Sequence, residues 1–313
     1  MNAFKYGIWL IIGLALIGMA AADSNYAYRV GTTILIFALL GASANLLTGT
    51  TGLMSLGHAG IYGMGAYTSA LLSTSAGLPI WATILLAGVV AAIFGVLITL
   101  PALRLTSVYF AVATLGVGQI IYVALLNWIS VTNGPMGISD IPPLFSVSTS
   151  VTFWVTLAIV AAGLWFIHRI VHSLYGNVLR ALREDDQCVQ VVGLSPLVLK
   201  SQALIISFFM AGIAGALWAH STGYIAPESF QFDQSILILA IIVVGGLGSL
   251  PGAVLGAVLL TGLPEVLRPL GDYRMFTVGL VMFLTIVLRP SGLWPEVLAL
   301  RWLQRRPARP EVK

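Results

Sequence analysis

Residues 80–103 read IWATILLAGVVAAIFGVLITLPAL, an apolar run that contains no charged side chain. At about 1.5 Å per residue, such a run can cross the roughly 30 Å hydrocarbon core of a bilayer as an α-helix. Hydrophobic residues make up 58% of the 313-residue chain and charged residues only 8%, whereas soluble proteins carry roughly 25% charged residues. So few charges cannot cover a soluble surface, which excludes a cytosolic enzyme, a disordered protein and a nucleic-acid binder.

Similar runs recur along the whole chain. Hydrophobicity is continuous within each run and does not alternate, which indicates membrane helices and excludes a β-barrel. We therefore predict an all-α, polytopic integral membrane protein with a single domain over 1–313 and ten transmembrane helices. Eight helices is the alternative, because the last three runs are short. The runs lie near residues 6–22, 30–48, 58–74, 80–103, 108–126, 151–167, 203–222, 235–249, 253–267 and 275–289.

The basic residues orient these helices. With the N-terminus in the cytoplasm, 12 of the 15 Lys and Arg residues fall on the inner side, and only Arg29, Arg268 and Arg274 fall outside. Cytoplasmic loops are enriched in Lys and Arg, so we expect both termini in the cytoplasm, with 290–313 as a basic cytoplasmic tail. This orientation needs the run at 6–22 as a retained helix, although the residues around it also fit a cleaved signal peptide.

One inner segment, residues 168–202, is longer and more charged than a simple connector. The spacing of its apolar residues predicts an amphipathic helix over 176–192. Gly193 is placed to end this helix in the left-handed conformation, and Pro196 prevents simple continuation. The residues expected to share the apolar stripe are Val178, Leu182, Val189 and Val192.

A cluster of charges of both signs accompanies the predicted helix. Lipid surfaces prefer uniformly positive helices, so a mixed cluster favours ion pairing with a cytoplasmic protein partner. The alternative is a solvated linker that lies on the lipid headgroups. The cluster comprises Arg180, Arg183, Glu184, Asp185 and Asp186.

The charged run LRALREDDQCVQVVGL, residues 179–194, resembles the coupling segment of the membrane permeases in branched-chain amino acid ABC importers, the Liv family. The family pattern is roughly R-A-I-R-E-x-E-x-A-A-E-A-x-G. Cys188, Val189 and Gln190 stand where the family has small and acidic residues. The matching residues are Arg180, Ala181, Arg183, Glu184 and Gly193.

Further segments extend the resemblance over most of residues 30–290. TGTTGLMSLGHAGIYGMGAYTSALL, residues 48–72, is similar to the family's T-G-x-x-G-x-x-S-L-G-H-A-x-F-x-G-x-G-A-Y segment. TNGPMGISDIP, residues 132–142, resembles its T-x-G-x-x-G-I-x-x-I-P outer loop. Residues 208–230 and 243–260 also fit the family. Within it, the chain is most similar to the LivM-type subunit.

The resemblance implies a permease subunit without a catalytic site or a cofactor of its own. It implies a LivH-type permease partner, two cytoplasmic ATPase subunits and an extracytoplasmic solute-binding protein, assembled in the bacterial cytoplasmic (inner) membrane. ATP hydrolysis would move the helix at 176–192, and the permeases would carry branched-chain or related hydrophobic amino acids into the cytoplasm. The implied ATPase-coupling residues are Arg180, Arg183, Glu184, Asp185, Asp186 and Gly193.

A glycine-rich segment between the second and third runs is a candidate for the translocation path. Irregular backbone at membrane depth is tolerated only where it is buried or lines a cavity, so its polar groups could face a solute. The alternative is a packed turn whose histidine is satisfied by a carbonyl. We expect no metal site, because no second ligand has suitable spacing and the chain has one cysteine. The candidate residues are Ser55, Gly57, His58, Tyr62 and Tyr67.

A second glycine-rich stretch, GGLGSLPG at 245–252, lacks the Lys-Ser/Thr ending of a phosphate-binding loop, so we reject nucleotide binding. Like the first stretch, it follows an inward-going run and precedes an outward-going helix. The units 30–74 and 235–267 are therefore candidates for a parallel internal repeat with substrate passing between them. An intramembrane asparagine is also typical of hydrogen bonding between helices. The candidate path residues added here are Asn45, Gly245, Gly246 and Gly248.

Two other functional classes fit this sequence less well. An ion-coupled secondary transporter would usually carry carboxylates or histidines within its spans, whereas the acidic residues here lie almost wholly in loops. A membrane-embedded enzyme would need a convergent polar constellation. Within the leading class, urea, short amides and aromatic acids are alternative cargoes, because selectivity lies largely in the binding protein. The scarcity of buried charge suits a zwitterionic or neutral solute.

Overall fold

The computed structural model describes residues 25–105, 107–144, 148–268, 271 and 273–295. Within these residues the regular elements are helices. One isolated antiparallel bridge pairs Ile138 with Ile225. The run predicted at 6–22 and most of the predicted tail at 290–313 lie outside the described residues.

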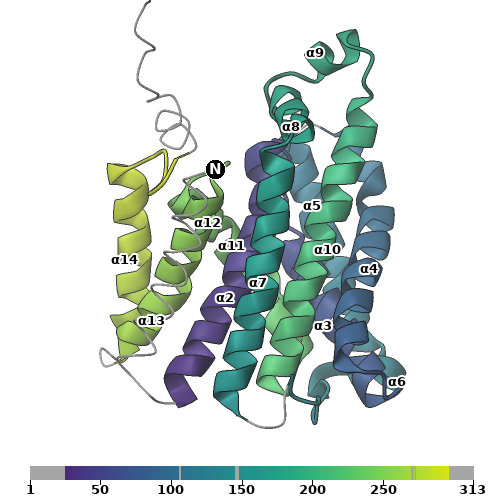
Figure 1. The fold of residues 1–313 in the computed structure, drawn as a ribbon, viewed down its shortest axis with the longest axis vertical. Helices are drawn as coiled ribbons and strands as arrows, with labels where there is room; N and C mark the ends of the chain where they lie inside the picture. Colours follow the sequence, from purple (N-terminus) through teal and green to yellow (C-terminus); the bar gives the residue numbers. More distant parts are fainter. Residues whose placement is uncertain (1–24, 106, 145–147, 269–270, 272, 296–313) are drawn as a thin grey trace, which may run out of the picture.

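The helices run mostly up and down beside one another (Figure 1). The longer ones are α2 (Asn25–Asn45), α3 (His58–Thr74), α4 (Ile80–Thr99), α5 (Ser107–Asn127), α7 (Thr149–Val171), α10 (Pro196–Thr222), α11 (Phe232–Gly245) and α14 (Tyr273–Leu288). The shorter ones are α6 (Ile129–Thr132), α8 (Leu174–Glu184), α9 (Asp186–Val191), α12 (Leu250–Ala257) and α13 (Leu263–Val266). Single turns join them: the π-helical η1 (Leu46–Thr50) and η5 (Val258–Gly262), and the 3₁₀ turns η2 (Leu100–Arg104), η3 (Gly134–Met136) and η4 (Pro227–Phe230).

Among the described residues, six helices are long and apolar enough to cross a membrane. Two shorter apolar helices follow, Leu250–Glu265 and Phe276–Leu288, and the 17-residue α3 coincides with the run predicted at 58–74. This confirms an all-helical, multi-span protein in the described part of the chain. Ten helices and a cytoplasmic position of both termini stay predictions. The six spans are Asn25–Thr50, Ile80–Arg104, Val108–Asn127, Thr149–Val171, Pro196–Thr222 and Pro227–Gly245.

The core lies where α10 packs between α3 and α4, and small residues set the distance between these helices. A Cβ added at Gly65 of α3 would lie 2.4 Å from the carbonyl oxygen of Gly212 in α10. A Cβ added at Gly212 would lie 2.7 Å from the carbonyl oxygen of Ala87 in α4. Such close backbone approach supplies the van der Waals contact that holds membrane helices together, where lipid provides no hydrophobic driving force between them.

The segment between the runs predicted at 203–222 and 235–249 is partly helical and folds back into the bundle. Phe230 is 2% exposed, and a Cβ at Gly63 would lie 2.7 Å from its ring. The same ring meets Tyr62 and Tyr67 edge-on, with centroids 5.3 and 6.0 Å apart. The aromatic side chain fills the space left by the glycine, and the start of α11 packs beside the first turn of α3, where the hydroxyl of Ser235 accepts from the backbone N–H of Ala59 at 3.3 Å.

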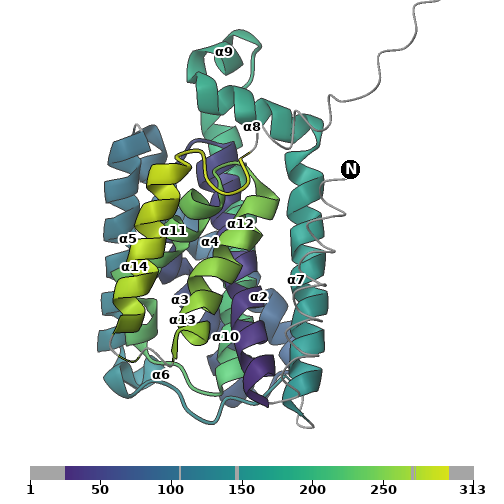
Figure 2. The same cartoon turned by 90° about the vertical axis from the view of Figure 1, so that its left-hand side faces the viewer.

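Two short helices, α8 and α9, project beyond one end of the bundle, which we call the α8 end (Figures 1 and 2). The prediction of a single helix over 176–192 is wrong. Asp185 has extended backbone, and its carboxylate accepts a hydrogen bond from the backbone N–H of Gln187, so it caps a new helix. Leu182 is buried as expected, but Val192 is 77% exposed and leaves the predicted stripe.

Candidate functional site

The two glycine-rich segments meet at the α8 end. We call residues 46–57, between α2 and α3, the first break, and residues 246–249, between α11 and α12, the second break. The buried Asn45 lies at the end of α2, where its amide nitrogen donates to the carbonyl of Ser249 and its amide oxygen accepts from the N–H of Gly248, both at 2.9 Å. One side chain thus satisfies a donor and an acceptor of the second break.

Glycine at position 49 allows this contact between the breaks. A Cβ there would lie 2.2 Å from both the Asn45 side-chain oxygen and the backbone nitrogen of Gly248. Gly245, Gly246 and Gly248 are buried at the same junction. The structure therefore brings together Asn45 and the three glycines that the sequence suggested for the path, as a packed junction.

The other side of the second break contacts the segment that follows α14. The backbone N–H groups of Leu293 and Trp294 donate to the carbonyls of Val244 and Gly245, each at 2.9 Å. Gly246 has a φ of +126°, and a Cβ there would lie 2.7 Å from the carbonyl oxygen of Trp294. This contact needs backbone groups and the absence of a side chain, so hydropathy could not reveal it.

Arg183 of α8 reaches the first break. Its Nη1 donates to the carbonyl of Gly49 at 2.6 Å, and its Nε and Nη2 donate to the carboxylate of Glu184 at 3.3 and 3.2 Å. Its stem crosses Gly52, whose φ is +79° and whose Cβ, if present, would lie 2.8 Å from the Arg183 Cγ. A residue predicted to couple to an ATPase therefore contacts the interrupted span of its own chain.

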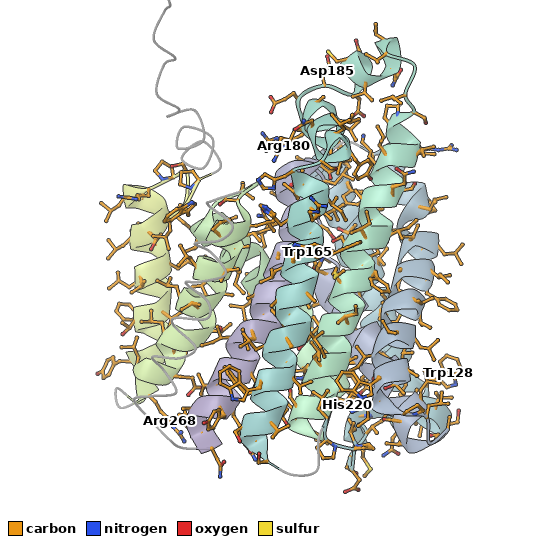
Figure 3. All side chains as sticks on the ribbon, in the orientation of Figure 1. Trp128, Trp165, Arg180, Asp185, His220 and Arg268 are labelled. Atoms are coloured by element: carbon orange, nitrogen blue, oxygen red, sulfur yellow. The ribbon has the colours of Figure 1, made fainter. Side chains whose placement is uncertain are left out.

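The other predicted coupling residues lie on the surface of the α8 end. Arg180 donates to the side chain of Asn177, one turn earlier on α8, at 3.0 Å. Asp186 forms a salt bridge with Lys200 of α10. Figure 3 shows Arg180 and Asp185 at this end of the bundle. A cleft of about 540 Å³ opens here, and its charged lining consists of Arg104, Arg183, Glu184, Asp185, Asp186 and Lys200.

The tip of the extension is apolar. Gly193 ends it with a φ of +84°, which confirms the predicted left-handed residue. Val191 and Val192, just before it, are 88% and 77% exposed. An exposed apolar tip rimmed by charges is typical of a surface that contacts another protein.

Buried contacts hold α8 on the bundle. Leu179 and Leu182 are buried, and a Cβ at Gly176 would lie 2.2 Å from the carbonyl oxygen of Val171. The hydroxyl of Tyr175 donates to the carbonyl of Leu199 at 3.4 Å, and burial raises the pKa of this phenol to about 12. The extension is thus fastened along its base, while its charged side faces outward.

His58, the first residue of α3, is satisfied by hydroxyl groups. The Ser207 hydroxyl donates to the carbonyl of Ser43 at 2.7 Å, so its oxygen is left to accept from His58 Nε2–H at 3.2 Å. The Nδ1 atom then accepts from the hydroxyl of Ser55 at 3.5 Å. His58 is 1% exposed, so it fits the packed-turn alternative, with hydroxyls in place of the expected carbonyl.

Tyr62 and Tyr67 are the polar groups of α3 that packing does not explain. Both side chains are 2% exposed, and neither hydroxyl has a hydrogen-bond partner among the described residues.

Gly57 has a structural role, because a Cβ there would lie 2.3 Å from the carbonyl oxygen of Thr114 in α5. Within the described residues, no group of three or more His, Cys, Asp and Glu is placed to hold a metal ion.

Sequence reasoning missed the buried His220 and its hydrogen-bond partners at the opposite end of the bundle, where Figure 3 labels this residue. Its Nδ1–H donates to the carbonyl of Pro142 at 2.7 Å, and its Nε2 accepts from the hydroxyl of Ser69 at 2.8 Å. Together with the bridge between Ile138 and Ile225, this ties the loop after α6 to the end of α10. The sequence signal that could have found this residue is a single histidine within the apolar run at 203–222.

Six candidate spans among the described residues, with two interrupted helices that meet at the α8 end, indicate a multi-pass membrane protein. Residues 26–288 match the family model described as branched-chain amino acid transport system / permease component. The chain belongs to this family, which confirms the resemblance seen in its motifs.

Several curated relatives cover most of the chain. The high-affinity branched-chain amino acid transport system permease protein LivM of Salmonella typhimurium is 39% identical over 87% of this chain and 71% of its own length. LivM of Escherichia coli K12 is 38% identical over 85% and 69%. The corresponding permease protein LivH of Escherichia coli K12 is 25% identical over 83% and 92%. No solved structure matches the chain.

Proposed function

We propose that the chain is a LivM-type permease subunit of an ABC importer in a bacterial inner membrane. It moves branched-chain or related hydrophobic amino acids into the cytoplasm and has no catalytic site of its own. The observation that carries this proposal is the 39% identity to a LivM permease over 87% of the chain. ATP hydrolysis by two partner ATPase subunits supplies the energy.

In this proposal the α8 end faces the cytoplasm and an ATPase subunit binds there. The charges of the extension and its exposed tip at Val191 and Val192 support a protein contact. Residues 168–202 then form the coupling segment. The orientation agrees with the described basic residues: Arg104, Arg180, Arg183 and Lys200 lie at the α8 end, whereas Arg29 and Arg268 lie at the end that carries His220.

A LivH-type permease is the partner within the membrane, and the two subunits form the path together. LivH relatives support this pairing, because they match 83% of the chain. An extracytoplasmic solute-binding protein delivers the solute at the end that carries His220. Tyr62 and Tyr67 are candidate path residues, because their buried hydroxyls have no partner among the described residues.

The test is transport by the reconstituted assembly. The chain is co-expressed with a candidate LivH-type permease, two candidate ATPases and a candidate binding protein from the same organism, and the purified assembly is placed in proteoliposomes. We expect ATP-dependent leucine uptake that survives an uncoupler and stops when the ATPase is inactivated. Uptake of urea, a short amide or an aromatic acid in place of leucine would change the assigned cargo. Uptake that persists without the ATPase and collapses with an uncoupler would indicate an ion-coupled transporter instead.

A further inference from the structure

Arg183 lies against the body of the protein rather than on the exposed side of the extension. Its side chain is 31% exposed, whereas the neighbouring Glu184 side chain is 74% exposed. Gly52 makes this position possible, since a Cβ there would lie 2.8 Å from the Arg183 Cγ. The arginine stem therefore occupies the space over the first break.

The group that Arg183 binds is the kind that needs a cationic donor. Gly49 lies in the last turn of η1, where helical carbonyls have no partner further along the helix and carry the negative end of the helix dipole. A guanidinium N–H supplies a charge-assisted hydrogen bond, which is stronger than a neutral one. The 2.6 Å contact thus fastens α8 to the end of the first span.

The same residue of the first break touches the second break. Gly49 packs directly on Gly248, and Asn45 hydrogen-bonds the backbone on both sides of that contact. Three hydrogen bonds therefore connect α8 with the second break between α11 and α12, although these elements are far apart in sequence. The route is Arg183 to Gly49, then Asn45, then Gly248 and Ser249.

We propose that Arg183 is a positioning residue that makes α8 and both breaks move as one body. It carries a displacement of α8 into the two interrupted helices and does not itself bind the ATPase. The proposal rests on the proposed function, because it takes a partner ATPase as the source of that displacement. Spatial connection alone does not demonstrate energetic coupling, so the experiment measures coupling directly.

The first arm uses the complete importer in proteoliposomes. Arg183→Met keeps the stem over Gly52 and removes the donors, Arg183→Lys restores one donor, and Arg289→Gln is the matched control. Arg289 is exposed and follows α14, outside the coupling segment. We expect Arg183→Met to lower leucine uptake per ATP hydrolysed by about 10-fold, a size typical of coupling between sites, with ATPase co-purification unchanged. Arg183→Lys should recover part of the loss, and Arg289→Gln should behave as wild type.

Each other outcome overturns the proposal. Normal uptake per ATP in Arg183→Met would mean that the contact transmits nothing, and loss of ATPase co-purification would mean that Arg183 binds the partner. Wild-type uptake is measured first. A wild-type importer that carries no leucine would contradict the proposed function rather than the role of Arg183.

The second arm needs no change at Arg183 and so remains available if the variant does not fold. Spin labels are attached at the exposed Leu174 of α8 and Leu247 of the second break, with Cys188→Ser removing the native thiol. We expect the distance between the labels to stay the same in nucleotide-free and ATP-trapped states of the assembly. A distance that changes between the two states would show that α8 and the second break move separately, and would overturn the proposal.

Discussion

The two breaks are built from similar residues but are held in different ways. The first break receives a charged side chain, Arg183, from a helix that lies outside the bundle. The second break receives the backbone of the segment that follows α14, through Leu293 and Trp294. Asn45 lies between them and hydrogen-bonds the second break.

We call the contact of Arg183 with the first break the input, and the backbone hydrogen bonds of Leu293 and Trp294 to the second break the anchor. A side-chain contact from the extension can carry a displacement into the first break. A pair of backbone hydrogen bonds within the chain holds the second break to its own neighbour instead. The junction at Asn45 is then the place where the two meet, and substitutions on each side of it should have unequal effects.

The largest effect is expected where the breaks touch. Gly49→Ala places a Cβ 2.2 Å from the Asn45 side-chain oxygen and from the Gly248 nitrogen, so the breaks must separate. Overpacking together with the loss of buried hydrogen bonds should cost about 4 kcal/mol. Thermal denaturation of the purified assembly, followed by gel filtration, measures the loss. Gly116→Ala in α5 is the control, because a Cβ there meets nothing within 4 Å; equal denaturation midpoints for both variants would contradict the contact.

A slightly smaller effect is expected from Asn45→Leu, which keeps the volume and removes the polar atoms. The N–H of Gly248 and the carbonyl of Ser249 then stay buried without this partner, at a cost of about 3 kcal/mol. The same denaturation assay applies. Asn127→Leu is the control, since that asparagine is exposed and bonds only one turn back to Val123. A stable Asn45→Leu variant would show that the breaks are held by other contacts.

The anchor of the second break can be tested with a pair of glycines. Gly292 and Gly271 both have positive φ, at +85° and +55°, so alanine strains either backbone. Only at Gly292 would the new Cβ also meet the backbone of Gly246, 2.4 Å from its Cα. We therefore expect Gly292→Ala to destabilise by about 2 kcal/mol more than Gly271→Ala, because of overpacking. Equal denaturation midpoints would show that the segment after α14 does not hold the break.

The helices could be predicted from the sequence because a helix that crosses a membrane needs a continuous apolar run. The run at 80–103 corresponds to the span Ile80–Arg104. The exceptions lie where a single residue acts locally: Asp185 caps a new helix and divides the predicted one. Phe230 fills the space beside Gly63, so the segment between the runs predicted at 203–222 and 235–249 lies inside the bundle. Hydropathy averages over many residues and does not detect either effect.

The sequence named some residues of the candidate site but not its connections. Asn45, Gly57, Gly246, Gly248 and Arg183 were singled out by residue type and motif, whereas Gly49 and Gly52 of the first break were not. Their pairing depends on contacts between residues about 130 to 200 positions apart, which no local periodicity encodes. His220 was missed for the same reason, since its partners Ser69 and Pro142 lie on other elements.

The smallest effect is expected at the hydroxyl that ties α10 to the helices on either side of the first break, α2 and α3. Ser207→Ala removes the donor to the Ser43 carbonyl and the acceptor for His58, which are both buried. Net hydrogen bonds of this kind are worth about 0.5 to 1 kcal/mol each, so the two together should cost about 1 to 2 kcal/mol and the denaturation midpoint should fall modestly. Ser201→Ala on the same helix is the control, because that hydroxyl bonds to the carbonyl of Leu197 in its own helix. If the two variants denature alike, the first break is held by Arg183 and Asn45 without help from α10, which would sharpen the contrast between input and anchor.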